Sequence, residues 1–266
     1  MPTPPRIFAI DWSGDCRNGR RKIWLAEVSR GELIRLENGR SREEIVRLLI
    51  EEAMKDARLI VGLDFAFSFP LWFCAKLGVK TAFDVWTQVA KEGERWLHSC
   101  SIPFWGRSGT KCPTEGQRFR KTELDCASNG SAARPKSVFQ IGGAGAVGTG
   151  SIRGMPILKT LREAGFSIWP FDPPGCPTVV EIYPRALTGP VNKSSPDVRR
   201  TNLRTNFPQL SKRFVTVASS CEDAFDAAVS ALVMHRRIDA LVNLSQATDP
   251  CELLEGKIWW HVHSMA

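Results

Sequence analysis

The sequence lacks the features that mark membrane and secreted proteins. No apolar run approaches the ~20 residues needed to span a bilayer. The proline-rich start passes into a predicted strand without the apolar segment of a signal peptide. The eight cysteines include no CxxC pair. We therefore expect a reduced, cytoplasmic protein without a membrane role.

Negative charge is scarce relative to positive charge. The chain carries 36 Lys and Arg against 28 Asp and Glu, a net charge of +8, which favours an anionic partner such as nucleic acid. Basic residues gather in polar stretches at 17–22, 107–121 and 199–213, although an ordinary solvated surface explains any one of these runs as well. We expect phosphates to contact five side chains of the second stretch: Arg107, Lys111, Arg118, Arg120 and Lys121.

The composition predicts one elaborated α/β domain over residues 1–266, since 43% of the residues are hydrophobic and 24% are charged. The continuous apolar runs at its start are typical of buried strands, and the expected order is strand 7–11, strand 22–28, strand 32–37, helix 41–55 and strand 59–63. The first three strands should be antiparallel. The fourth follows a helix and should lie parallel to the first.

After the fourth strand the pattern changes to a large insertion of helix and loop at about 68–152, expected to cover the substrate. Pro156 suits the first turn of a helix that Gly165 ends. One of the two apolar segments that follow should supply the fifth core strand. The remaining elements are expected at helix 82–97, helix 156–164, segments 166–171 and 178–183, helix 221–237 with Ser219 or Ser220 as its cap, and strand 257–262.

Acidic residues stand where these elements begin and end. Asp11 and Asp64 end apolar strands, and Asp223 and Asp226 lie three positions apart at the start of an apolar helix, so they share one helix face. Parallel neighbouring strands end at the same sheet edge, which brings the first two together. Each acid alone has an ordinary explanation as a turn or capping residue, so the inference depends on their joint placement.

Converging carboxylates cannot all ionise cheaply without a cation. Hard oxygen ligands of this kind suit Mg²⁺ or Mn²⁺ rather than zinc. We therefore predict that Asp11, Asp64, Asp223 and Asp226 bind one or both of these ions, with Glu181 of Val-Val-Glu-Ile-Tyr-Pro binding metal or orienting water. Two such ions would clamp the attacking and leaving oxygens of a phosphodiester.

The implied order of strands and helices, with acids ending the first and fourth strands and D-x-x-D on the last helix, resembles the ribonuclease H-like superfamily. Four segments are similar to the signature blocks of the DUF429 family, a group of predicted nucleases. They are Ala9-Ile-Asp-Trp-Ser13, Val61-Gly-Leu-Asp-Phe-Ala-Phe-Ser-Phe-Pro70, Val180-Glu-Ile-Tyr-Pro-Arg185 and Asp223-Ala-Phe-Asp-Ala227.

The resemblance implies a ribonuclease H-like mixed five-stranded core sheet flanked by helices, and a metal-dependent nuclease. By position, the four aspartates match the metal-binding acids of the superfamily, whereas Glu181 matches only the narrower family block. A nucleotide-dependent phosphotransferase of the same fold and a non-catalytic nucleic-acid-binding module remain open as alternatives.

Three other patterns favour different chemistry. Gly143-Ala-Gly-Ala-Val-Gly148 after a possible strand at 137–141, with Asp172 beyond it, fits a dinucleotide fingerprint. However, residues 149–154 separate these glycines from the predicted helix, so a loop over the active site is the favoured interpretation. A zinc site is weakly indicated at His98, Cys100, Cys112 and Cys126. Ser13 has no G-x-S-x-G elbow, so a serine nucleophile with His98, His235, His261 or His263 as base is unsupported.

Overall fold

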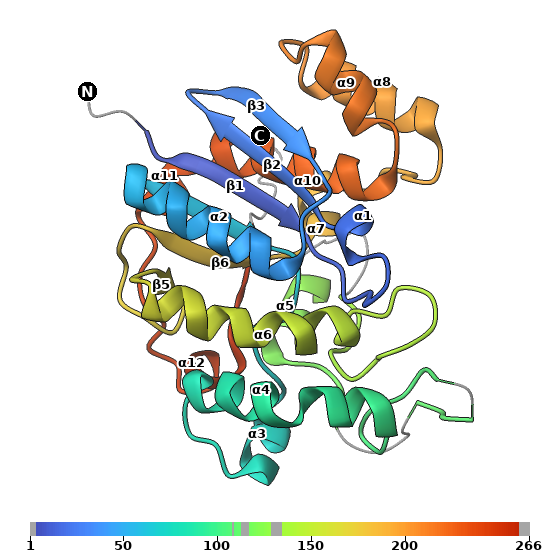
Figure 1. The fold of residues 1–266 in the computed structure, drawn as a ribbon, viewed down its shortest axis with the longest axis vertical. Coiled ribbons are helices and arrows are strands. Elements are labelled where there is room, and N and C mark those ends of the chain that lie inside the picture. The colour runs from blue at the N-terminus through green and yellow to red at the C-terminus, as the bar shows by residue number, and fades with distance from the viewer. Residues whose placement is uncertain (1–3, 108, 113–116, 129–134, 261–266) are drawn as a thin grey trace.

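A mixed sheet forms the centre of the protein (Figure 1). The computed structural model describes residues 4–107, 109–112, 117–128 and 135–260. The described strands are β1 (Arg6–Asp11), β2 (Trp24–Ser29), β3 (Glu32–Glu37), β4 (Leu59–Leu63), β5 (Ser167–Ile168), β6 (Thr178–Ile182) and β7 (Ile258–Trp259). Their order is β3-β2-β1-β4-β6-β5, and β7 also pairs with β6.

The direction of each pair follows the predicted pattern. β1 pairs antiparallel with β2, and β2 antiparallel with β3. β1 and β4 are parallel neighbours, and β4 is parallel to β6. The five longer strands form the predicted mixed sheet. The short strand β7 lies within the predicted final strand, whereas β5 was not expected, because only one of the segments 166–171 and 178–183 was predicted as a strand. These two short strands make the sheet seven-stranded.

Helices cover both faces of the sheet (Figure 1). One face carries α2 (Arg42–Lys55) and α6 (Gly148–Glu163), with α4 (Ala82–Ser99) packed against α6. The other face carries α10 (Glu222–Arg236), which packs on β1, β2 and β3. The remaining described helices are α1 (Gly19–Lys22), α3 (Leu71–Leu77), α5 (Lys121–Ser128), α7 (Pro184–Thr188), α8 (Pro196–Asn206), α9 (Lys212–Ala218), α11 (Ile238–Val242) and α12 (Glu252–Glu255).

Strand alternation divides the core in two. Phe8 and Ile10 of β1 face α2 and α6, whereas Ile7 and Ala9 face α10. Gly62 of β4 belongs to the α10 face, where a Cβ atom would lie only 2.7 Å from Sδ of Met234. The glycine therefore allows α10 to approach the sheet closely.

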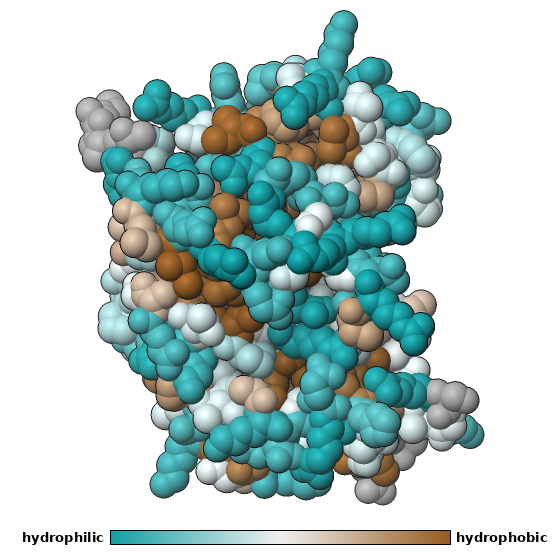
Figure 2. Space-filling view, in the orientation of Figure 1, coloured by the Kyte–Doolittle hydropathy of each residue, from teal (hydrophilic) through white to brown (hydrophobic). Residues whose placement is uncertain are grey.

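The helices of the predicted insertion belong to the main core of the protein. Helices α3 and α4 pack into the same hydrophobic core as β1 and β4, with Phe73 and Trp86 both buried there. The expected end of the insertion at residue 152 falls inside α6. No helix in the described part of the chain is long and apolar enough to cross a membrane. Hydrophilic side chains cover much of the face in Figure 2, with smaller hydrophobic patches between them.

The prediction for the start of α6 is wrong. The helix begins at Gly148, and Pro156 lies inside it rather than in its first turn. Glycine and proline are poor helix formers, which hid this start in the sequence. Tertiary contacts stabilise the helix instead: a Cβ on Gly154 would lie 2.7 Å from the Phe65 ring, and the Ser151 hydroxyl accepts a 3.0 Å hydrogen bond from the Ala66 N–H.

Smaller differences concern element ends. Cys221, not Ser219 or Ser220, caps α10, because its Sγ accepts a hydrogen bond from Ala224 N–H at 3.4 Å. Residues 137–141 form no core strand; Gln140 makes only an isolated bridge to Trp105. The final strand ends at Trp259, and positions 261 and 262 of the predicted strand lie outside the described residues. The capping box at Ser41 and Glu44 is confirmed.

Candidate active site

Two strand ends bring the first pair of aspartates together. Asp11 is the last residue of β1, and Asp64 directly follows β4. The Asp64 N–H donates a hydrogen bond to the Ile10 carbonyl at 3.1 Å, which continues the β1–β4 ladder to this point. Ile10 and Leu63 face α6, so alternation turns Asp11 and Asp64 toward the face covered by α10. The predicted neighbourhood of these strands is confirmed.

The N-terminal end of α10 supplies the second pair. Asp223 lies in the first turn of the helix and Asp226 lies one turn further on, where it is only 7% exposed. The positive end of the helix dipole favours carboxylates here. The structure thus brings aspartates from β1, β4 and α10 to one edge of the sheet.

The electrostatics show that the four carboxylates act on one another. Burial raises the pKa of Asp11 well above its usual value, and Asp64, Asp226 and Asp223 raise it further. Burial likewise raises the pKa of Asp64, which Asp226 also raises. Burial raises the pKa of Asp226 to about 6, although Lys193 opposes this shift. Four acids with raised pKa values cost the metal-free protein free energy at neutral pH.

Lys193 is the residue that the sequence interpretation missed. Its Nζ contacts Asp226 Oδ2 in a partly buried ion pair. It lies in the loop between α7 and α8, remote in sequence from the four aspartates. The one available signal was indirect: two acids at the start of an apolar helix require a positive group nearby.

A cavity of about 440 Å³ opens beside these acids. Asp11, Asp64 and Asp223 line it together with Lys22 and Trp12. The Trp12 Nε1 is buried and has no hydrogen-bond partner. Residues 145–147 and the first turn of α6 form the remaining wall, so the glycine-containing loop lies on the cavity that holds the carboxylates.

The predicted separation of the glycine loop from the following helix is wrong. The loop leads directly into α6, with no separating segment at 149–154. A Cβ on Gly14 would lie 2.4 Å from the Gly150 nitrogen, so the loop after β1 and the start of α6 are in backbone contact. Asp172, the predicted ribose contact, is instead bound by Arg162 at 2.9 Å. The dinucleotide interpretation therefore loses its acidic residue and its preceding strand.

Glu181 and Arg120, predicted as a metal ligand and as a phosphate ligand, bind each other, although the charge of Glu181 still raises the pKa of Asp64. Glu181 pairs in register with Leu63, so it lies on the opposite face from Asp11 and Asp64. Arg120 Nη1 donates to Glu181 Oε2 at 2.8 Å, and Phe67 N–H donates to the same oxygen at 3.0 Å. Arg120 is 1% exposed and cannot serve as a surface phosphate ligand.

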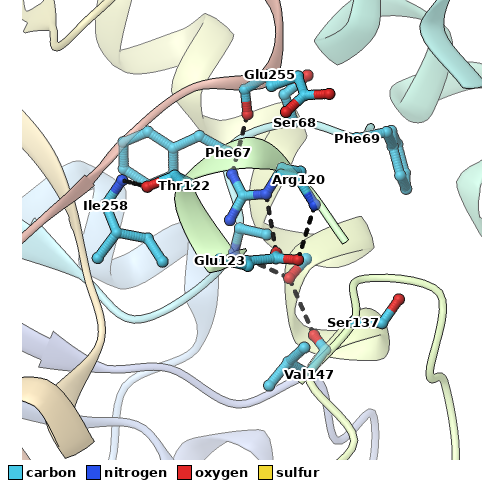
Figure 3. A network of polar contacts seen from close by, with 12 residues as sticks. Phe67, Ser68, Phe69, Arg120, Thr122, Glu123, Ser137, Val147, Glu255 and Ile258 are labelled. Atoms are coloured by element: carbon cyan, nitrogen blue, oxygen red, sulfur yellow. Dashed lines mark hydrogen bonds and ion pairs between the residues drawn. The ribbon is translucent and has the colours of Figure 1, made fainter. Parts of the chain in front are cut away.

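Further contacts complete this buried cluster. Arg120 Nε donates to Glu123 at 2.9 Å, and its Nη1 donates to the Glu255 carbonyl at 3.0 Å. Figure 3 shows the Arg120 guanidinium pointing toward both Glu123 and Glu255. The carboxylate of Glu255 accepts the backbone N–H groups of Leu71 and Lys121, each at 2.6 Å. The hydrogen bonds and ion pairs of Arg120 and Glu255 therefore join segments that are distant in sequence.

The other predicted phosphate ligands differ in accessibility. Arg107 and Lys111 are exposed. Arg118 is partly buried, with Nη1 donating to Cys112 Sγ at 2.6 Å, and Lys121 pairs with Asp249. Only the first two side chains are both exposed and outside a described ion pair.

The aspartates offer oxygen ligands that suit a divalent metal ion. As the side chains stand, no group of three or more His, Cys, Asp or Glu in the described residues is arranged to hold an ion, and His98 with the three cysteines forms no such group. His261 and His263 lie outside the described residues. However, Asp226 Oδ1 is buried without a hydrogen-bond partner. A buried anionic oxygen in this state fits a cation once the neighbouring carboxylates turn toward it.

Comparison of the chain with protein-family models, with curated proteins and with solved structures found no match.

Proposed function

We propose that the protein is a Mg²⁺- or Mn²⁺-dependent phosphodiesterase acting on nucleic acid. The observation that carries this proposal is the convergence of Asp11, Asp64, Asp223 and Asp226, in which burial and neighbouring charge raise the carboxylate pKa values. A site that concentrates unneutralised carboxylates gains free energy when it binds a divalent cation.

The topology supports a ribonuclease H-like interpretation. Three antiparallel strands are followed by parallel strands in the order β3-β2-β1-β4-β6, with the acids at the ends of β1 and β4 and on α10. This matches the arrangement that the resemblance to the ribonuclease H-like superfamily and the DUF429 family implies.

The opposite wall of the cavity suits a phosphate. The first turn of α6 faces the same space as the acids. The Gly148 N–H already donates to the Gln140 carbonyl at 2.9 Å, but the N–H groups of Thr149 and Gly150 and the positive dipole end of the helix favour an anion. Lys22, which also lines the cavity, adds a cation whose Nζ lies 2.8 Å from Asp15 Oδ2. A phosphodiester placed between the two walls would meet carboxylate-bound metal on one side and backbone N–H groups on the other.

The aspartates and the exposed basic residues would have different roles. Asp11, Asp64 and Asp223 line the cavity and would hold the metal, while Asp226 closes the cluster from α10. When bound, the divalent ion would lower the pKa of a coordinated water and offset charge on the phosphate. Arg107 and Lys111, exposed in the basic stretch, would bind flanking phosphates.

A nucleotide-dependent phosphotransferase is the second candidate. The observation that favours it is the glycine loop that leads directly into α6 beside the acids, since such loops cradle nucleotide phosphates. Net turnover of ATP in the presence of small-molecule acceptors, without cleavage of nucleic acid, would support this alternative.

Hydrolysis of labelled single-stranded RNA, single-stranded DNA and their duplexes with Mn²⁺ or with EDTA tests the proposal. We expect metal-dependent cleavage, with Asp64→Asn losing on the order of 100-fold or more because about 3 kcal/mol of transition-state stabilisation is removed. Asp239→Asn is the matched control, since Asp239 is exposed on α11, which follows the C-terminal end of α10, whereas Asp223 and Asp226 lie at its N-terminal end. Equal cleavage by both variants would refute the proposal.

A further inference from the structure

Lys193 lies among the aspartates in a way that a surface lysine does not. Its side chain is 16% exposed, and Nζ contacts Asp226 Oδ2 while Asp226 Oδ1 has no partner. The charge of Lys193 also lowers the pKa of Asp11, Asp64 and Asp223. One ammonium group therefore acts on all four carboxylates.

Two buried contacts fix the backbone that presents this lysine. The Lys193 carbonyl accepts a hydrogen bond from Arg199 Nη1, and Arg199 is 3% exposed. Arg199 also donates to the Ser219 carbonyl, from Nη2 at 2.8 Å and from Nε at 3.1 Å. Because Ser219 lies just before α10, Arg199 ties the Lys193 loop to the helix that carries Asp226.

A second arginine holds the same loop on its other side. Arg185 of α7 donates from Nη1 to the Val191 carbonyl at 2.5 Å. The loop is thus bound at positions 191 and 193, and α7 packs against α10. These buried hydrogen bonds fix the position of the Lys193 backbone, which a mobile surface lysine would not require.

Charge counting distinguishes a one-ion site from a two-ion site. Four aspartates bring four negative charges, and the fixed ammonium offsets one of them. One divalent ion leaves a net charge of about −1, whereas a second would add positive charge beside an ammonium that already contacts Asp226. The second ion would have to displace Lys193 from its partner.

We propose that Lys193 is a built-in cation that takes the place of a second divalent ion, so that the site binds a single Mg²⁺ or Mn²⁺. The inference rests on the proposed metal-dependent function. Asp11, Asp64 and Asp223 would hold the ion, and Asp226, whose Oδ2 contacts Lys193, would offer it Oδ1. Lys193 is then a positioning residue for the carboxylates, and its charge remains in place whether or not metal is present.

Counting Mn²⁺ per chain tests the proposal without any measurement of activity. Calorimetric titration and electron paramagnetic resonance of wild type should give one ion with the spectrum of an isolated Mn²⁺. Lys193→Met frees Asp226 and should bind a second, magnetically coupled ion. Lys193→Arg should keep the count at one, because it retains a cation beside Asp226.

Lys22→Met is the matched control, since it removes a lysine from the same cavity but not from Asp226. It should still bind one ion. Two ions in wild type, or one ion in both wild type and folded Lys193→Met, would overturn the inference and leave the metal site intact. No ion in wild type would overturn the proposed function as well. Two ions in wild type would overturn the inference even if Lys193→Met does not fold.

Discussion

Two groups of acids lie on the same sheet and differ in how their charge is met. Glu181 is bound by a buried arginine and a backbone N–H group, and the arginine in turn binds Glu123. Burial raises the pKa of Glu123 to about 7, and Arg120 opposes this shift. For Asp11 and Asp64, neighbouring aspartates add to the effect of burial and raise the pKa further, and Asp226 keeps one oxygen without a partner. The first group has the properties of a structural network, and the second has those of the metal site that we propose.

The difference arises from strand alternation. Glu181 of β6 points to the face of α6, where Arg120 from the segment before α5 reaches it. Asp11 and Asp64 point to the face of α10, whose first turns contribute only further acids. Glu181 is paired with Leu63, one position before Asp64, and this offset of one residue places the two acids on opposite faces of the sheet. A carboxylate with satisfied hydrogen bonds stabilises a fold, and a group of carboxylates without them is available for chemistry.

The largest expected effect follows from breaking the satisfied group. Arg120→Met leaves Glu181 and Glu123 buried without a counter-charge, so we expect the free energy of unfolding to fall by about 3–5 kcal/mol. Urea denaturation followed by circular dichroism measures this loss. Arg107→Met, a change of the same chemistry at an exposed position, should alter stability by less than about 0.5 kcal/mol. Equal stability of the two variants would show that the Arg120 cluster does not support the fold.

Neutralising an acid of the unsatisfied group should have the opposite sign. Asp11→Asn keeps the shape and removes repulsion among the aspartates, so without metal it should stabilise the protein by about 1 kcal/mol. In a chain of this size that corresponds to a rise in Tm of about 2–4 °C. Scanning calorimetry in EDTA measures the shift. A clear fall in Tm would instead identify Asp11 as a residue that satisfies buried donors.

The pH dependence sharpens the same comparison. An aspartate whose folded-state pKa is raised destabilises the fold fully above that pKa, and the cost disappears below its unfolded value. For Asp11 this window runs upward from 3.8 to a folded-state pKa well above that value. The stability gain of Asp11→Asn over wild type should therefore shrink as the pH falls from 7 to 4. Denaturation at several pH values in EDTA tests this, and a gain that grows toward low pH would contradict it.

The smallest expected effect concerns the basic surface. Arg107 and Lys111 are exposed, so neutralising both should weaken nucleic-acid binding and lower the salt slope by about 1–2. Arg30 and Arg237 are matched controls, because both are exposed and follow the ends of β2 and α10 remote from the acids. Fluorescence anisotropy across a salt series measures the slopes. Equal slopes for the two double variants would rule out a specific role for Arg107 and Lys111.

Local patterns in the sequence predicted much of the fold. The continuous apolar runs gave β1 and β4, and the capping box at Ser41 gave the start of α2, because these signals act within a few residues. The same patterns placed Asp11 and Asp64 at neighbouring strand ends. They failed at α6, where Gly148 and Pro156 disfavour a helix that tertiary packing stabilises.

Contacts between side chains that are distant in sequence could not be predicted from the sequence. Arg120 and Lys193 both stand in irregular segments, and nothing nearby in the sequence indicates that one binds Glu181 and the other Asp226. The face occupied by Glu181 was in principle predictable, since Val180 and Ile182 alternate with it along β6. Applying alternation to β6 would have separated Glu181 from the aspartates.

The most direct test of the account is a crystal structure of the protein with Mn²⁺, located by its anomalous scattering. We expect one Mn²⁺ within coordinating distance of Asp11 and its neighbouring aspartates, with Lys193 still bound to Asp226 and with Glu181 still bound to Arg120. An empty aspartate cluster at millimolar Mn²⁺, or an ion held by Glu181 instead, would contradict it.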